Sequence, residues 1–358
     1  MHTSEKPNQT GDLRQDPFST LLRLLRRDLD PHQVEDEDWP DILVQSRRHH
    51  LLGPLSQSLR EMGASLPETW EREMVFQRWV NTWLFESLEE MEDDLGDRGV
   101  RVIRLKGAST APRLYADSGD RHLSDMDVLV RPHEAKVVTT WLEAKGYVHQ
   151  PVLEWEGTRN RMAFARVHRS GLEVSLDVHT GLYWRQPPGL SERVVYDQAG
   201  FWRLCDEVEL LHLIVNWIEQ DTCVSFNKAY DIQLLVRHLH DRINWNEWWQ
   251  WARDLGHGRS VRLAAFVLSS CFGVRIPMLA NSQGTWSEAL LSPGFLAAPQ
   301  AHRLRYLTLK HCTRPLTRAL AYDWGWFSAR VKSRLAKRLR GLGLIRDGLE
   351  CFSKEIDH

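Results

Sequence analysis

The chain has 358 residues, of which 42% are apolar and 26% are charged, and its formal net charge is −2. This balance is typical of a soluble globular protein with one large or two ordinary domains, and it excludes a strong overall bias toward nucleic acid or membranes. The five cysteines have no CxxC spacing, which argues against a zinc site and predicts reduced thiols rather than a disulfide framework. With no signal peptide and no apolar run near the roughly 18 residues of a spanning helix, we expect a cytoplasmic protein.

Residues 17–99 are predicted to form an N-terminal helical region, after a polar tail (residues 1–16) that we expect to be disordered. A second helical segment runs from about 39 to 59. A long third helix begins at Pro67 and ends at Gly99, which has the position of a helix C-cap.

The second segment contains the adjacent pair His49-His50. Two histidines suggest a metal site, but adjacent side chains on a helix diverge by about 100°. A metal role for this pair is therefore disfavoured.

The stretch Val102–Val130, VIRLKGASTAPRLYADSGDRHLSDMDVLV, carries the clearest chemistry. It predicts a strand (Val102–Leu105), a turn containing glycine (Lys106–Ser109), a short helix, a polar loop and a second strand (Met126–Val130). The loop and the strand together present two aspartates to the turn.

Asp125 and Asp127 are one residue apart at the start of the second strand, where residues i and i+2 point to the same face. Two carboxylates so close repel each other unless a cation joins them. Mg²⁺ is the expected ion, because it binds oxygen ligands and keeps open positions for phosphate.

The turn before the aspartates offers groups that could hold that phosphate. Gly107 allows close approach of the backbone, and the hydroxyl of Ser109 could donate to it. Lys106 could reach a phosphate or pair with an aspartate. Arg121, in the loop, could clamp a phosphate with two hydrogen bonds or simply be solvated.

A helix is expected after Pro132, over 133–145, followed by a hairpin whose arms are 161–168 and 172–179. The second arm alternates, so Asp177 and His179 share its polar face. The pattern predicts a small mixed sheet with helices on one side.

Asp177 is the candidate for a third carboxylate, which a second metal ion would require, and it could also act as a general base. His179 could orient Asp177 or be a half-buried core histidine, the reading that we favour slightly.

Helical segments resume at Asp206 and form a predicted bundle. On one of them Lys228 and Asp231 are one turn apart; they could reach a nucleotide, but an ordinary surface pair is favoured.

Residues 277–299 read as a linker or lid. The basic stretch 330–346 reads as a solvated helix face or a contact for an anionic partner.

Gly107, Ser109 and the Asp125-Met126-Asp127 run resemble the G-[GS]-x(n)-D-x-D signature of the polymerase-beta-like nucleotidyltransferase superfamily. The wider sequence, from about 35 to 275, resembles an uncharacterised bacterial nucleotidyltransferase family often found near peptide-modification and polysaccharide gene clusters. Two features depart from the superfamily pattern: the serine is one position late, and Lys106 precedes the glycine.

The resemblance implies an α+β fold, in which a small mixed β-sheet nucleotidyltransferase core (100–204) is flanked by the N-terminal helices and a C-terminal helical domain (205–358). It also implies one or two Mg²⁺ ions and an NTP substrate. The residues that match metal ligands or catalytic acids are Asp125, Asp127 and Asp177, and those that match the phosphate loop are Gly107 and Ser109.

The expected function is Mg²⁺-dependent transfer of a nucleoside monophosphate from an NTP to an acceptor, which could be a small molecule, a peptide or a glycan precursor. Two alternatives stay open. The scaffold could be a nucleotide-binding regulatory or partner-binding module with little turnover, or it could modify nucleic acid through its basic C-terminus. The sequence leaves open the nucleotide, the acceptor, the oligomeric state and the choice between nucleotidyl and phosphoryl transfer.

Overall fold

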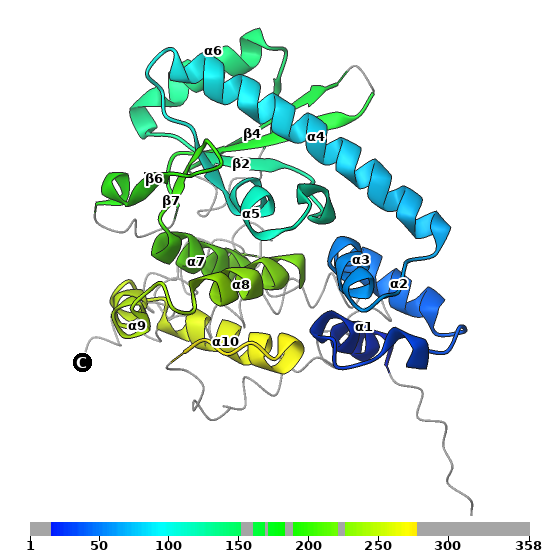
Figure 1. Cartoon of the computed structure of the whole chain (residues 1–358). Coiled ribbons are helices and arrows are strands. Elements are labelled where there is room, and N and C mark those ends of the chain that lie inside the picture. The colour runs from blue at the N-terminus through cyan, green and yellow to red at the C-terminus, as the bar shows by residue number, and fades with distance from the viewer. Residues whose placement is uncertain (1–15, 152–159, 169–170, 183–188, 221–225, 278–358) are drawn as a thin grey trace, which may run out of the picture.

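The computed structural model describes residues 16–151, 160–168, 171–182, 189–220 and 226–277, which form a mixed sheet with helices on both faces (Figure 1). Apart from Asp16, the predicted N-terminal tail lies outside the described residues. So do the predicted linker or lid beyond Pro277 and the basic C-terminal stretch. None of the described helices is both long and apolar enough to cross a membrane.

The N-terminal region is helical, as predicted, but its second segment is two helices. The chain breaks at His50, whose φ of 54° lies in the left-handed region. The long fourth helix ends at Gly96, three residues earlier than expected, and Gly99 follows with φ 76°. The helices are α1 (Pro17–Arg26), α2 (Trp39–Arg48), α3 (Leu52–Glu61) and α4 (Glu68–Gly96), with a 3₁₀ turn at Pro31–Gln33.

The sheet has seven strands in the order β3-β4-β5-β2-β1-β7-β6. It is mixed, as expected, because β2 runs parallel to β5 and β1 to β7, while the other neighbours are antiparallel. The strands are β1 (Ile103–Leu105), β2 (Met126–Leu129), β3 (Val148–Gln150), β4 (Arg161–Val167), β5 (Glu173–His179), β6 (Val194–Tyr196) and β7 (Trp202–Leu204). Strands β6 and β7 were not predicted, since three residues are too few to show an alternating pattern.

Helices pack on both faces of the sheet, so the expectation of one covered side is wrong (Figure 1). On one face Val128 and Leu176 join a core with α4 and with α6 (Ala135–Ala144). On the other face Leu105 and Leu129 belong to a second core with the C-terminal helices. Alternate residues of β2 therefore reach different layers, and Asp127 shares its face with Leu129.

The C-terminal bundle is confirmed, and it shares its core with the first three helices. Phe18 of α1 packs edge-on against Phe226 of α8, with 4.9 Å between ring centroids. Both are fully buried, as are Ile42 of α2 and Val267 of α10. The helices are α7 (Asp206–Val215), α8 (Phe226–Leu239), α9 (Trp245–Asp254) and α10 (Gly258–Phe272), with a π-helical segment at Asn216–Gln220.

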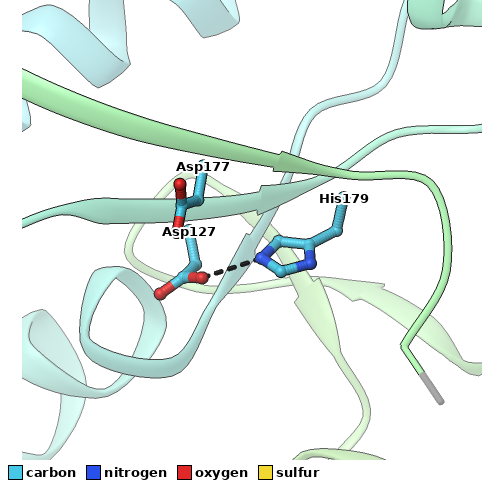
Figure 2. Close-up of side chains that lie close together, drawn as sticks. All are labelled: Asp127, Asp177 and His179. Atoms are coloured by element: carbon cyan, nitrogen blue, oxygen red, sulfur yellow. Dashed lines mark hydrogen bonds and ion pairs between the residues drawn. The ribbon is translucent and has the colours of Figure 1, made fainter. Parts of the chain in front are cut away.

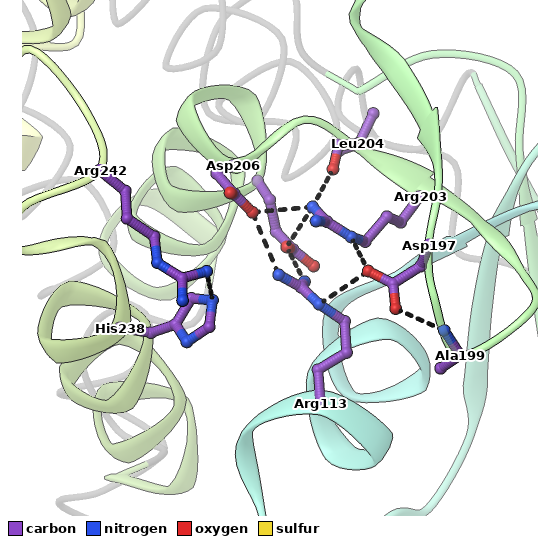
Figure 3. Close-up of polar contacts among 9 residues, drawn as sticks. Arg113, Asp197, Ala199, Arg203, Leu204, Asp206, His238 and Arg242 are labelled. Atoms are coloured by element: carbon purple, nitrogen blue, oxygen red, sulfur yellow. Dashed lines mark hydrogen bonds and ion pairs between the residues drawn. The ribbon is translucent and has the colours of Figure 1, made fainter.

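An ion network fixes α5 (Lys106–Leu114) to α7 and to the β6–β7 hairpin (Figure 3). Arg113 of α5 lies 3.1 Å from Asp206 and 2.5 Å from Glu209. Arg203 of β7 pairs with Asp206 at 2.8 Å and with Asp197 at 2.6 Å. The network holds the helix that follows β1 against the sheet layer that carries the aspartates.

The loop before β2 is anchored at Asp120 in the 3₁₀ turn η2 (Ser118–Asp120). Asp120 is 1% exposed and accepts hydrogen bonds from Arg60 of α3 at 2.9 Å and from Arg78 of α4 at 3.2 Å. Gly53 of α3 lies directly beneath, where an added Cβ would be 1.9 Å from the Asp120 carbonyl oxygen. The loop can dock here only because position 53 has no side chain.

Gly53→Ala is expected to destabilise the fold by about 1–3 kcal/mol, because the clashing atoms belong to the backbone and cannot rotate away. Urea unfolding measures the change. Gly96→Ala is the matched control, since a Cβ there meets nothing within 4 Å, and it should be neutral or slightly stabilising. Equal midpoints for the two variants would show that the loop is not docked on α3.

Candidate active site

Asp127 and Asp177 lie side by side on the parallel strands β2 and β5, where they are direct partners in register. Figure 2 shows their carboxylates together with the ring of His179 on the same face of the sheet. One ligand atom from each of the three residues lies within 4.8 Å of the others. The aspartates are only 6% and 5% exposed, so little water screens their charges.

Asp127 is held by two positive or polar partners. Its Oδ1 accepts from Lys106 Nζ at 2.5 Å and contacts His179 Nε2 at 2.8 Å. Burial alone would raise the pKa of Asp127, but Lys106 and His179 outweigh it and hold the pKa below its usual range. The predicted roles of His179, orienting Asp177 or filling the core, both differ from this contact with Asp127.

Asp177 pairs with Arg161 of β4, at 2.5 Å between Nη2 and Oδ2. Burial and the neighbouring charge of Asp127 nevertheless raise the pKa of Asp177, against the effect of Arg161. Two buried carboxylates in register therefore repel each other, and a cation between them would relieve the repulsion.

Asp125 precedes β2 and is half-buried, and Ser124 Oγ donates to its Oδ1 at 3.0 Å. Its negative charge acts on both Lys106 and Asp177, which places it beside the cluster. It is nevertheless not one of the three residues whose ligand atoms converge within 4.8 Å.

A cavity of about 240 Å³ opens next to Asp127. Five of the predicted site residues line it: Lys106, Gly107, Arg121, Asp125 and Asp127. The lining also includes His50, His122, Leu123, Ser124, Asn227 and Lys228. Two predicted residues, Ser109 and Asp177, are not in the lining; Ser109 is fully buried within α5, away from the position expected of a phosphate donor.

The predicted turn Lys106–Ser109 is wrong, because these residues form the first turn of α5. Lys106, not Gly107, takes the left-handed conformation, with φ 47°. A non-glycine residue there is strained, and the sharp change of direction brings the lysine back to Asp127. A Cβ at position 107 would lie 2.4 Å from Leu123 Cδ2, so a larger residue there would require the Leu123 side chain to shift.

Arg121 is committed to a buried ion pair. Its Nε and Nη2 donate to both oxygens of Asp231 on α8 at 2.7–3.0 Å, and its Nη1 donates to the His122 carbonyl. Tyr115 adds a hydrogen bond to Asp231 at 2.7 Å. Although Arg121 lines the cavity, its guanidinium is bonded to Asp231 of the helical bundle.

The predicted surface pair of Lys228 and Asp231 is therefore wrong, because Asp231 is fully buried. Lys228 Nζ donates instead to Asn216 Oδ1 at 2.8 Å, and its side chain lines the cavity. Lys106 and Lys228 together add positive charge to the lining of the cavity.

The donor set fits a hard divalent cation. Asp125 and Asp127 line the cavity, Asp177 is the partner in register of Asp127, and Mg²⁺ prefers such oxygen ligands. The geometry brings Asp127 and Asp177 together, with Asp125 adjacent, so these residues would hold the ion.

Sequence reasoning did not assign the cavity residues His50 and His122. Their rings stack at 4.1 Å between centroids, with 8° between planes. His49, by contrast, packs between Phe18 and Phe226, so the two adjacent histidines serve different parts of the molecule. Because no pattern within one segment pairs His50 with His122, only the fold could bring them together.

A protein-family model described as "uncharacterised nucleotidyltransferase" matches residues 35–273, which is more than half of the chain. Among solved structures, the chain is similar to an antigenic nucleotidyltransferase-like protein from Paracoccidioides brasiliensis, at 16% identity and a TM-score of 0.34; the match covers 54% of this chain and 93% of that one. No protein of curated function matches. The chain therefore belongs to the family of uncharacterised nucleotidyltransferases and is a transferase enzyme.

Proposed function

We propose that this enzyme transfers a nucleoside monophosphate from an NTP to an acceptor, using Mg²⁺ held by Asp125, Asp127 and Asp177. The observation that carries the proposal is the pairing in register of Asp127 and Asp177 beside a cavity with lysines in its wall. The D-x-D run with a glycine upstream further supports membership of the polymerase-beta-like superfamily.

Each part of the site has a task in this reaction. The carboxylates would hold the metal, which would neutralise charge on the phosphate oxygens. Lys106 keeps a positive charge in the cavity, because Asp127 and Asp125 raise its pKa against the effect of burial. Gly107 lies in the first turn of α5, where backbone N–H groups and the helix dipole favour an anion.

The chemistry itself is a displacement at the α-phosphorus. The acceptor oxygen forms a bond to that phosphorus, the bond to the β-phosphate oxygen breaks, and pyrophosphate leaves with the electron pair. Catalysis by this chain consists of positioning and charge stabilisation. The acceptor class that we propose is a small molecule, a peptide or a glycan precursor.

Incubation with each of the four α-³²P NTPs tests the proposal. We expect label to appear in a product other than the NTP in the presence of Mg²⁺. Removal of the metal with EDTA should lower the rate by on the order of 10²-fold or more, and excess Mg²⁺ should restore it. Nucleotide binding with no turnover under any metal condition would favour the alternative of a regulatory module.

A further inference from the structure

A directed chain of hydrogen bonds runs from α4 to the cavity. It begins at Asn81, which is 1% exposed. Asn81 Nδ2 donates to the carbonyl oxygens of Ser118 at 2.8 Å and Arg121 at 2.7 Å. Carbonyl oxygens only accept, so the amide orientation is fixed and Asn81 Oδ1 must accept.

Gln77, one turn earlier on α4, supplies the next step. Its Nε2 donates to Asn81 Oδ1 at 2.8 Å and to the Leu123 carbonyl at 3.3 Å. Its Oε1 is therefore the atom that faces His122 Nδ1, at 2.7 Å. An amide oxygen cannot donate, so Nδ1 of His122 must carry a proton.

His122 is held neutral by its surroundings. Burial, the stacked ring of His50 and the charge of Arg121 lower the pKa of His122 to about 3. A neutral imidazole with a proton on Nδ1 has a lone pair on Nε2. Within the described part of the chain no group hydrogen-bonds to Nε2, and the ring lines the cavity beside Asp125 and Asp127.

The backbone reinforces this arrangement. His50 is a non-glycine residue in the left-handed region, a conformation that is costly and that persists only where its surroundings require it. Here it brings the His50 ring onto His122. His50, disfavoured as part of a metal pair with His49, thus helps to orient the His122 ring.

We propose that His122 Nε2 is the proton acceptor for the nucleophilic O–H group of the acceptor substrate. The inference rests on the proposed nucleotidyl transfer. As the acceptor oxygen bonds to the α-phosphorus and pyrophosphate leaves, the hydroxyl proton passes to Nε2 and gives an imidazolium. The negative triphosphate in the cavity raises the basicity of the ring and stabilises that cation.

Other occupants fit this position less well. Ionised phosphate oxygens only accept hydrogen bonds, so they cannot bind a lone pair. Asp177, the other candidate base, is paired with Arg161 and does not line the cavity.

The first test reads the tautomer without turnover. In ¹⁵N-histidine-labelled protein, the signals that disappear in His122→Gln identify the ring. We expect a neutral ring with a proton on Nδ1 and none on Nε2 between pH 5.5 and 8. A spectrum showing Nε2–H, or a charged ring, over this range would overturn the inference even if the enzyme transfers nucleotides.

The second test uses water as the nucleophile, measured as Mg²⁺-dependent release of α-³²P-labelled NMP. His122→Ala should lower kcat by about 10²-fold or more, with KM for the NTP within about twofold of wild type. His133→Ala, at an exposed position, is the matched control. A raised KM with unchanged kcat would mean that His122 contacts the nucleotide, and it would overturn the inference. A wild-type enzyme that releases no labelled NMP would instead count against the proposed function.

Gln77→Glu places a carboxylate against Nδ1 of His122, and it removes the Nε2 donor to Asn81 Oδ1 and to the Leu123 carbonyl. The charged groups that face His122 are Arg121 and, when protonated, His50, and the substitution adds a carboxylate at Nδ1 that raises the pKa of His122. Turnover of Gln77→Glu should therefore fall in acid at a higher pH than turnover of the wild type, as the His122 ring takes up a proton. Gln150→Glu on the exposed edge strand β3 is the control. Parallel pH profiles for Gln77→Glu and wild type would contradict the proposal.

Discussion

Asp127→Asn is expected to lower the rate of nucleotidyl transfer by on the order of 10³-fold, the scale of losing one preorganised charge at a transition state. The change removes a negative charge from the point where β2, β5 and the cavity meet. Asn keeps the shape of the side chain but offers only one neutral oxygen to a metal. The measurement is the α-³²P transfer assay at saturating NTP and Mg²⁺.

The matched control for this experiment is Glu173→Gln, which removes one carboxylate from the exposed start of β5. It should leave the rate within about twofold of wild type, since surface charges have small effects. If Asp127→Asn and Glu173→Gln behaved alike, Asp127 could not be a metal ligand.

Asp127→Asn also changes the stability of the fold, and this effect can be measured separately from catalysis. The pKa of Asp127 is depressed in the folded protein, so its ion pair with Lys106 stabilises the fold above the unfolded-state pKa. This contribution is lost as pH falls through the folded-state pKa. Urea unfolding should therefore show a difference between wild type and Asp127→Asn at neutral pH that narrows in acid.

Asp231→Ala is expected to cost about 3–5 kcal/mol of folding free energy, because it leaves the Arg121 guanidinium buried without its partner. Arg121 and Asp231 are 5% and 0% exposed, and the pair joins α8 to the loop that carries His122 and Asp125. Tyr115 also loses its hydrogen-bond acceptor. Urea unfolding gives the free energy, and Asp241→Ala, at a highly exposed aspartate just beyond α8, should change it by less than about 0.5 kcal/mol.

The double variant Arg121→Met/Asp231→Leu tests whether Arg121 acts only in folding or also in catalysis. Replacing a buried ion pair by apolar side chains of similar size is often neutral for stability, so much of the loss should be recovered. If Arg121 also contacts a phosphate, as its sequence position suggested, the double variant should remain slow in nucleotidyl transfer although its stability is recovered. A single Asp231→Ala variant as stable as wild type would show that the pair does not hold the loop.

The sequence by itself determined the elements whose signals are local. The alternation in Glu173–His179 placed Asp177 and His179 on one face, and the glycine and proline boundaries gave the main helices and the mixed α+β class. The spacing of Asp125 and Asp127 indicated carboxylates at the start of a strand. These features follow from backbone periodicity, which can be recognised within a single segment of the sequence.

Only the tertiary structure decided which of these residues meet. The parallel pairing of β2 with β5 put Asp127 beside Asp177, and strained backbone at Lys106 and His50 turned their side chains toward Asp127 and His122. The buried pair of Arg121 with Asp231 joins residues 110 positions apart. Such contacts depend on how layers pack and on which buried charges need partners. The free energy of burial is set by the whole fold, so no pattern within one segment could specify them.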